Sequence, residues 1–439
     1  MRRLWIFLAC LSCALGGSAG ARAADAPEAL TLQAALAAPL QDQYTILRAE
    51  AELARARAIQ AQVLSWYDPV VTVTGQLRAI RPSRVAPDPD NHADNAIGIS
   101  ARQQLFDFGR QTNRDAAAAE QLRGAELNLA AQTQRQKLAI LKAFFAVLLA
   151  DQTDTVANEH MAVVYVRFDK TKDRRELGMV SADDLAKAQI EYENALYARS
   201  EADSNRRTSR RILAELLGTP NALPGKLVSP TLDALFARSP PELAEAIQRS
   251  LRDDPTLQSL KAQYAAAVHR VEVARDHNMP NIYAEVNAEE YQRALGSRDP
   301  LRAGIYLSVP LYDGRLRDAE LGRAQADRMQ LAAAIAERES YLRESCTAVL
   351  ERIALYRKAG LSRAKAQADY ADLNFTRKQT LYQMEKATDL GDAMVEESAA
   401  TLLRLRNTLA LATAWAELLE MQNQPLDRLF LSDSSEPAP

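Results

Sequence analysis

The chain has 439 residues, of which 47% are hydrophobic and 25% charged, and its formal net charge is -3. This balance of charges excludes a strongly basic nucleic-acid-binding surface, so no nucleic-acid partner is expected. Aromatic residues make up only 6%, and the abundance of Ala, Leu, Gln, Arg and Glu favours long helices over a β-rich or disordered chain.

The first residues have the pattern of a secretory signal peptide. Arg2 and Arg3 precede an apolar run from Leu4 to Leu15, and small residues then lead to an A-x-A site that ends at Ala23. We therefore expect a signal peptide over residues 1–23. The apolar run is shorter than the roughly 20 residues that a membrane anchor needs.

Cysteine and histidine usage predicts neither a metal site nor a cofactor. Cleavage after Ala23 would leave only Cys346, which excludes an intrachain disulfide and disfavours a cysteine-based metal site. The alternative of a lipidated N-terminus would need Cys10 or Cys13 as the modified residue. No later apolar stretch is long enough for a helical membrane span, so the chain would have to enter a membrane as strands.

The mature chain begins with a first structural repeat over residues 24–217. After a helix, two strands with alternating apolar and polar residues are expected at about 69–79 and 96–107. A proline-free helix follows from about Gln111 to Arg175, and a return helix from about Asp183 to Leu217.

A Pro- and Gly-rich segment, 218–241, breaks both periodicities and is expected to be a linker or equatorial segment. The second repeat, 242–431, has strands at about 280–290 and 302–313, a long helix to about Gln383 and a return helix to Met421. A disordered tail is expected over residues 432–439.

The two repeats are copies of one unit. "TILRAEAELARARAIQAQVLSWYDP" before the first strand pair corresponds to "TLQSLKAQYAAAVHRVEVARDHNMP" before the second, and "GISARQQLFD" corresponds to "GIYLSVPLYD". Each unit reads helix, strand, strand, long helix, helix. The fold class is therefore mainly α with a small β part, and duplicated.

Each strand is about 9–12 residues long, which suits a tilted transmembrane strand. Four strands cannot close a barrel, and open edges cannot face lipid. If the strands meet lipid, several chains must share one barrel. The alternative is a soluble sheet with one face on a core.

The motifs at the ends of the strands resemble those of TolC-type outer-membrane efflux and secretion factors. "LFDFGRQTNRDAAAAE" from Leu105 and "SVPLYDGRLRDAELGRAQA" from Ser308 are similar to the junctions between the family's barrel and its helical tunnel. "ELGMVSADDLAKAQIEYENA" from Glu176 is similar to the family's periplasmic tip. The junction residues are Leu105, Phe106, Asp107, Gly109, Leu311, Tyr312, Asp313 and Gly314.

The resemblance implies a homotrimer whose twelve strands form one transmembrane β-barrel, continuous with an α-helical barrel. Such a protein lies in the outer membrane of a Gram-negative bacterium, contacts its lipid and extends into the periplasm. It is a passive exit duct for tripartite efflux or type I secretion, without enzymatic activity or cofactor. Its partners are a periplasmic adaptor (membrane fusion) protein and an inner-membrane transporter. The cargo, which could be a drug, a metal ion or a protein, is left open.

The resemblance also places a gate at the tip. Asp184 corresponds to the family's tip aspartate in the first copy, and Asp389 and Asp392 to the pair in the second. Threefold symmetry would turn each into a ring of carboxylates. The alternative is that these are helix-start acids favoured by the helix dipole. Glu385 departs from the family pattern, because a basic gate partner is common at its position.

Gly178, Met179 and Val180 are the expected adaptor contact, since an exposed apolar tip needs a partner. A rival function is a soluble periplasmic coiled-coil scaffold or adaptor, which would not fractionate with the outer membrane. An enzyme is disfavoured because the sequence contains no G-x-S-x-G, P-loop, G-x-G-x-x-G or metal-ligand cluster.

Overall fold

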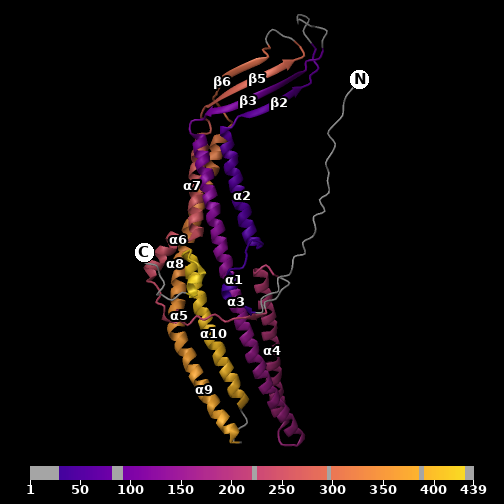
Figure 1. Ribbon diagram of the computed structural model, residues 1–439, viewed down its shortest axis with the longest axis vertical. Helices are drawn as coiled ribbons and strands as arrows, with labels where there is room; N and C mark the ends of the chain where they lie inside the picture. The colour runs from indigo at the N-terminus through magenta and orange to yellow at the C-terminus, as the bar shows by residue number, and fades with distance from the viewer. Residues whose placement is uncertain (1–28, 82–91, 220–224, 294–297, 385–389, 431–439) are drawn as a thin grey trace.

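The computed structural model describes residues 29–81, 92–219, 225–293, 298–384 and 390–430. The molecule is elongated, with a β-sheet at one end, a layer of helices below it, a thicker middle, and two helical hairpins at the other end (Figure 1). The expected signal peptide, the tail, Glu385 and Asp389 lie outside the described residues.

The sheet has four antiparallel strands in the order β2-β3-β5-β6. Their bounds are Val70–Gln76, Ala96–Phe106, Asn281–Tyr291 and Leu301–Ser308. Strands β3 and β5, one from each repeat, pair in the centre. Strands β2 and β6 therefore form the two edges, and the outer side of each pairs with no other strand among the described residues.

Two strands end earlier than the sequence predicts. Strand β2 ends at Gln76. Beyond it, the backbone N–H of Arg78 donates to Oδ1 of the Asn95 side chain, at 3.1 Å, and not to a neighbouring strand. Strand β6 stops at Ser308 rather than near 313, because Pro310 has no backbone N–H to donate to a ladder.

The register places polar side chains on one face of the sheet and apolar side chains on the other. Thr72, Ser100 and Asn287 stand side by side on the polar face, whereas Val73, Ile99 and Ala288 do so on the opposite face. No described segment covers the apolar face: Val73 is 68% exposed and Ile305 73%. The polar face is held by ion pairs, among them Arg102 with Glu285 at 2.5 Å.

Each repeat has one very long helix after its second strand. Helix α3 runs over 67 residues, Arg110–Glu176, which at 1.5 Å per residue is about 100 Å. Its counterpart in the second repeat consists of α8 (Leu316–Leu355), a π-helical turn η2 (Tyr356–Gly360) and α9 (Leu361–Gln383). The sequence predicts this second helix from about 316 to 383 but not its π-helical turn.

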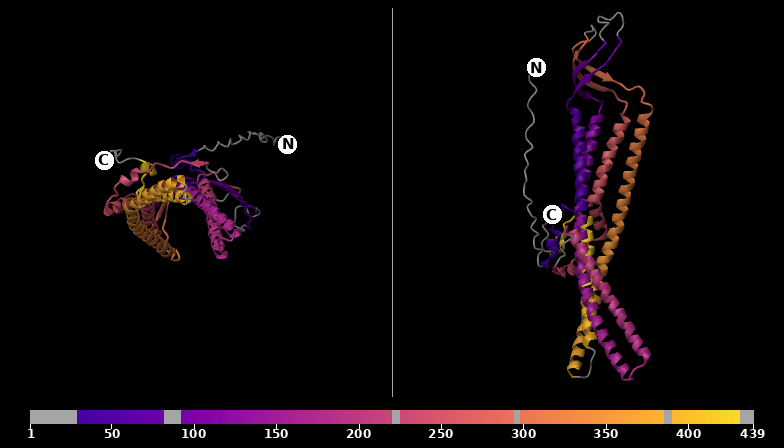
Figure 2. Two further views of the ribbon diagram at one scale, coloured as in Figure 1. Left: turned by 90° about the horizontal axis from the view of Figure 1, so that it is seen from below. Right: turned by 90° about the vertical axis from the view of Figure 1, so that its right-hand side faces the viewer.

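The long helices pair with shorter ones above and below the middle of the molecule. Helices α2 (Tyr44–Leu64) and α7 (Pro255–Arg275) precede the strands, and contacts run in the order α2, α3, α7, α8. Helices α4 (Ala182–Leu216) and α10 (Leu390–Met421) return from the far end against α3 and α9. Seen from below, the helices form a curved wall with a concave side (Figure 2).

The hydrophobic core lies in the middle, on the convex side of this wall. Here β1 (Ala29–Leu30) pairs in parallel with β4 (Lys226–Leu227). The other short elements are α1 (Leu32–Leu36), η1 (Ser65–Tyr67), α5 (Ala234–Ala237), α6 (Leu243–Asp253) and η3 (Leu426–Phe430). The expected linker region thus contains β4 and α5, short pieces that cover the long helices.

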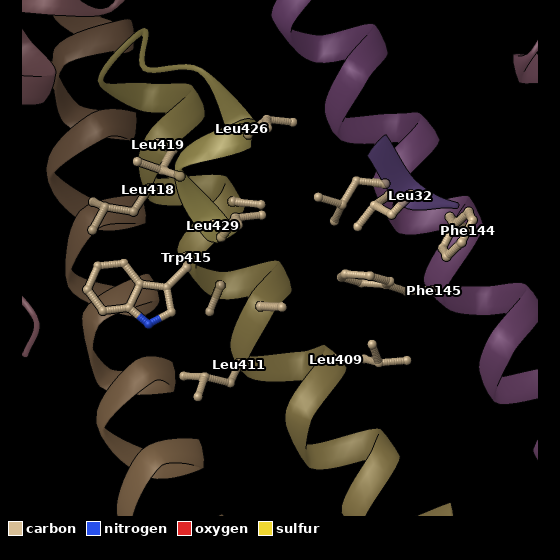
Figure 3. Packing of buried hydrophobic residues seen from close by; sticks show 14 of the residues in the cluster. Leu32, Phe144, Phe145, Leu409, Leu411, Trp415, Leu418, Leu419, Leu426 and Leu429 are labelled. Carbon is tan, nitrogen blue, oxygen red and sulfur yellow. The ribbon is translucent and has the colours of Figure 1, made fainter. Parts of the chain in front are cut away.

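Helix α10 carries much of this core between α3 and α8. Trp415, Leu411 and Leu418 extend to one side of α10, and Leu409 lies toward Phe145 on the other (Figure 3). All five side chains are less than 4% exposed. A wall one helix thick buries little apolar surface, so this buried cluster contributes strongly to the hydrophobic stabilisation of the chain.

Candidate pore-lining and gate sites

The first strand-to-helix junction turns through two residues with positive φ, Phe108 at 59° and Gly109 at 93°. Leu105 and Phe106 are about half exposed, while Asp107 is buried. The Asp107 carboxylate lies 3.9 Å from the guanidinium of Arg110 and 3.8 Å from that of Arg114.

Arg110, which sequence reasoning did not single out, holds this junction to the second repeat. Its buried guanidinium donates to the carbonyls of His277 at 2.9 Å and Pro280 at 3.2 Å, and to Oδ1 of Asn281 at 2.9 Å. Burial lowers the pKa of Arg110, but this group stays charged at neutral pH. The only signal in the sequence is its place directly after the turn.

The second junction uses its aspartate differently. Asp313 accepts backbone N–H bonds from Arg315 and Arg317, both at 3.0 Å, and so caps the start of α8. The Arg317 N–H contributes most to holding the pKa of Asp313 below its ordinary value. Gly314 has a φ of 68°, whereas Leu311 and Tyr312 are almost fully exposed.

The first tip is the turn between α3 and α4. Gly178 has a φ of 73°, which favours glycine, and its N–H donates to the carbonyl of Arg175 at 3.0 Å. The Met179 N–H donates to the Arg174 carbonyl at 2.8 Å, and Arg175 binds the Val180 carbonyl at 3.0 Å. Met179 itself is 65% exposed at the end of the molecule.

Asp184 forms a capping box with Ser181. The Asp184 N–H donates to Oγ of Ser181 at 3.0 Å, and the Asp184 carboxylate accepts from the hydroxyl and the N–H of Ser181. The Ser181 hydroxyl is the main cause of the lowered pKa of Asp184. This contact pattern is that of a helix-start acid.

Asp392 lies in the first turn of α10 and binds a side chain that the sequence did not reveal. Nη2 of Arg167 on α3 donates to both carboxylate oxygens, at 2.9 and 3.0 Å. Gly391, next to Asp392, lies against Val163, one turn before Arg167. The two helices are close here, since a Cβ on Gly391 would lie 2.7 Å from Cγ2 of Val163. Because Arg167 and Asp392 are 225 residues apart, no local motif could have identified the pair.

The structure therefore brings Asp392 to α3 and leaves Asp184 at its own helix start. In the part of the chain that the structure describes, no group of three or more His, Cys, Asp or Glu residues is arranged to hold a metal ion. None of the helices in the described ranges combines the length and apolar character that a membrane span requires.

Comparison with known proteins gives three consistent results. Residues 36–219 match the family model described as outer membrane efflux protein. Protein CyaE of Bordetella pertussis is 26% identical over 243 residues, which cover 54% of this chain and 51% of CyaE. The cobalt-zinc-cadmium resistance protein CzcC of Cupriavidus metallidurans is 24% identical over 297 residues, covering 66% and 68%.

The fold matches over almost the whole chain. The outer-membrane channel OprN superposes with a TM-score of 0.70 at 18% identity, covering 90% of each chain. The open state of the MtrE outer membrane channel of Neisseria gonorrhoeae gives 0.67 at 18%, covering 90% of this chain and 89% of MtrE. By sequence, the chain spans about half the length of CyaE and about two thirds of CzcC.

These relatives and structural neighbours include outer-membrane channels, and the expected fold class, mainly α with a small β part, is confirmed. The comparisons thereby confirm the resemblance: the chain is similar to outer membrane efflux proteins, in sequence over residues 36–219 and in fold over nearly its whole length.

Proposed function

We propose that the chain is one protomer of a passive exit duct for efflux or type I secretion, in which three copies share one barrel. The observation that carries this proposal is the sheet. In the part of the chain that the structure describes, it has one polar face, one exposed apolar face and two edges without a partner strand. Such a sheet is not stable alone in water or in lipid, because both its edges and its apolar face need cover.

Three copies would satisfy both needs. Pairing of β2 of one copy with β6 of the next would give twelve strands and leave no open edge. The apolar faces would contact lipid, and the polar faces, with Arg102 and Glu285, would line the interior. Because α3 and α8 follow β3 and β6 directly, the helical wall would continue the same tube. The exposed apolar face gives no support to the rival soluble scaffold.

For the gate, we propose that Asp392 acts together with Arg167. Their ion pair joins the α3–α4 hairpin to the α9–α10 hairpin at the end of the molecule away from the sheet. Asp389, three residues earlier, is proposed to face the constriction with Asp392, and Asp184 and Glu385 to lie near it. The capping box favours a mainly structural role for Asp184.

For the tip, we propose that Gly178, Met179 and Val180 contact a periplasmic adaptor that links the duct to an inner-membrane transporter. The exposed Met179 at the end of a turn supports this assignment. Transport would need no cofactor and no reaction in this chain, which remains a prediction.

The proposal is tested by reconstitution. The mature chain, purified from outer membranes, should run as a trimer in detergent and give step-like conductance in planar bilayers. The rival scaffold predicts a protein that is released with the periplasmic fraction and leaves bilayers electrically silent. Either of these outcomes would refute the channel.

A further inference from the structure

A hollow of about 530 Å³ lies just below the sheet, lined by α2, α3, α7 and α8 together. Since these four helices form the curved wall, a hollow to which all four contribute lies on its concave side (Figure 2). Its lining contains the charged residues Arg110, Arg114, Arg270, Arg323, Glu320 and Asp327.

Two of the four arginines, Arg110 and Arg114, already have interaction partners outside the hollow. Arg110 is buried and binds the backbone of the second repeat, as described above. Arg110 and Arg114 share one carboxylate, that of Asp107, at distances close to 4 Å. At this range the two guanidinium groups are only partly neutralised by a single carboxylate.

The other two arginines of the lining, Arg270 and Arg323, form no ion pair with any acidic residue that the structure describes. Arg270 donates to a neutral acceptor, Oε1 of Gln121. Glu320 contacts His277 instead, with 2.9 Å between Oε2 of Glu320 and Nδ1 of His277. Arg323 and Asp327, one turn apart on α8, form no ion pair in the described part of the chain.

Two of the four guanidinium groups at this level of the wall therefore have no carboxylate within ion-pair distance in the described ranges. The other two interact with Asp107, and the charge of Asp276 acts on Arg110 as well. Two basic side chains further along α3, by contrast, have acidic partners: Lys142 pairs with Glu417 at 2.6 Å, and Arg135 lies 3.9 Å from Glu420.

We propose that this hollow is an oxyanion site in the duct wall, where Arg270 and Arg323 bind carboxylate or phosphate groups of anionic cargo just before it enters the barrel. The inference rests on the proposed channel function and extends it to a class of ligand. Guanidinium groups suit oxyanions because their N–H donors match two oxygens at once. Rings of arginine select for anions in pores, and a narrow tube concentrates the field.

The test uses citrate, a trivalent carboxylate, as the probe. Single-channel conductance of the purified full-length trimer is recorded in diphytanoylphosphatidylcholine bilayers in KCl with increasing citrate. Wild-type channels should be blocked in a concentration-dependent manner. In the double variant R270Q/R323Q, the half-blocking concentration should rise about fivefold, since each screened charge pair contributes a factor of roughly two to five.

Two further variants make the test decisive. R249Q removes an exposed arginine of α6 that does not line the hollow, and its channels should be blocked by citrate like the wild type. D327N removes an unpaired acid at the hollow and should lower the half-blocking concentration about twofold. Unchanged block in R270Q/R323Q, or an equal shift in R249Q, overturns the inference. If the double variant does not assemble, the test rests on D327N. Citrate block of D327N that is unchanged or weaker than in the wild type then overturns the inference. A wild-type protein without conductance would instead refute the channel itself.

Discussion

The ion pair of Arg167 with Asp392 connects two hairpins through side chains that are each about half exposed. Exposed pairs contribute only about 0.2–1 kcal/mol to stability, so Arg167→Ala should leave the thermal unfolding of the trimer nearly unchanged. If the pair restrains the closed end, the same variant should increase the conductance of closed channels. Single-channel recordings measure this effect.

The control for this prediction is Lys187→Ala, which breaks the exposed pair of Lys187 with Asp183 within α4. It should leave conductance at the wild-type value. The exchanged variant R167D/D392R should restore most of the closed-state conductance. Equal conductance in wild type, R167A and K187A would show that the Arg167–Asp392 pair has no role in the gate.

The capping box at the start of α4 predicts a pH dependence. The pKa of Asp184 is lowered in the folded state, so its stabilising contribution is present above its ordinary pKa, about 4. This contribution is lost as the pH falls through the folded-state value. Hydrogen exchange of residues 180–188, corrected for intrinsic rates, should be constant from pH 7 to 5 and accelerate below about pH 4. In D184N this acceleration should be absent; its persistence would assign it to another group.

For single residues, the sequence predicted which residue types stand at the turns better than it predicted which side chains contact one another. Gly109, Gly178 and Gly314 could be identified because a turn with positive φ strongly favours glycine. Arg110 and Arg167 could not, because their partners are distant in the chain and only the folded arrangement brings them together. The gate around Glu385 and Asp389 lies outside the described residues and remains a prediction.

The π-helical turn between α8 and α9 is an element whose cause can be tested. Nδ2 of Asn407 on α10 donates to the Tyr356 carbonyl at 3.1 Å, and its Oδ1 would lie 1.9 Å from a Cβ on Gly360. Gly360→Ala should therefore destabilise the protein by about 1–3 kcal/mol. Thermal unfolding of the detergent-solubilised trimer at fixed protein concentration measures this change.

Gly322→Ala on α8 is the matched control, because nothing lies within 4 Å of its Cβ position. It should be neutral or stabilising by up to about 1 kcal/mol, as expected for alanine in a helix. Replacing Asn407 with Ala should reduce the cost of Gly360→Ala. If both glycine variants behave alike, the close contact with Asn407 does not determine the turn.

At the level of elements, periodicity was sufficient to predict the four strands and the long helices. Alternation over seven or more residues and proline-free stretches of 60 residues are strong signals. The π-helical turn and the short elements of the middle left no such signal, since they form where distant segments cover the long helices. The end of β6 was overestimated although Pro310 was visible in the sequence.

For the whole molecule, the decisive feature is that the two faces of the sheet meet different surroundings. Ile99 and Ser100 are neighbours in the centre of β3 but point to opposite faces. If three copies form a barrel in lipid, Ile99→Arg places a charge against hydrocarbon, at a cost of about 2–4 kcal/mol for each copy. Ser100→Arg places the same charge in a wet interior, where the cost is small.

The expected outcome is a contrast between two adjacent substitutions. I99R should lose outer-membrane fractionation and the detergent-stable trimer, whereas S100R should keep both and show a reduced conductance, because three arginines would narrow the interior. A soluble sheet with its apolar face on a core would also be destabilised by I99R, but it would give no trimer and no conductance for S100R. Since the two substitutions share chemistry and depth, loss of the trimer in I99R together with a conducting trimer in S100R would identify the apolar face as the one that meets lipid.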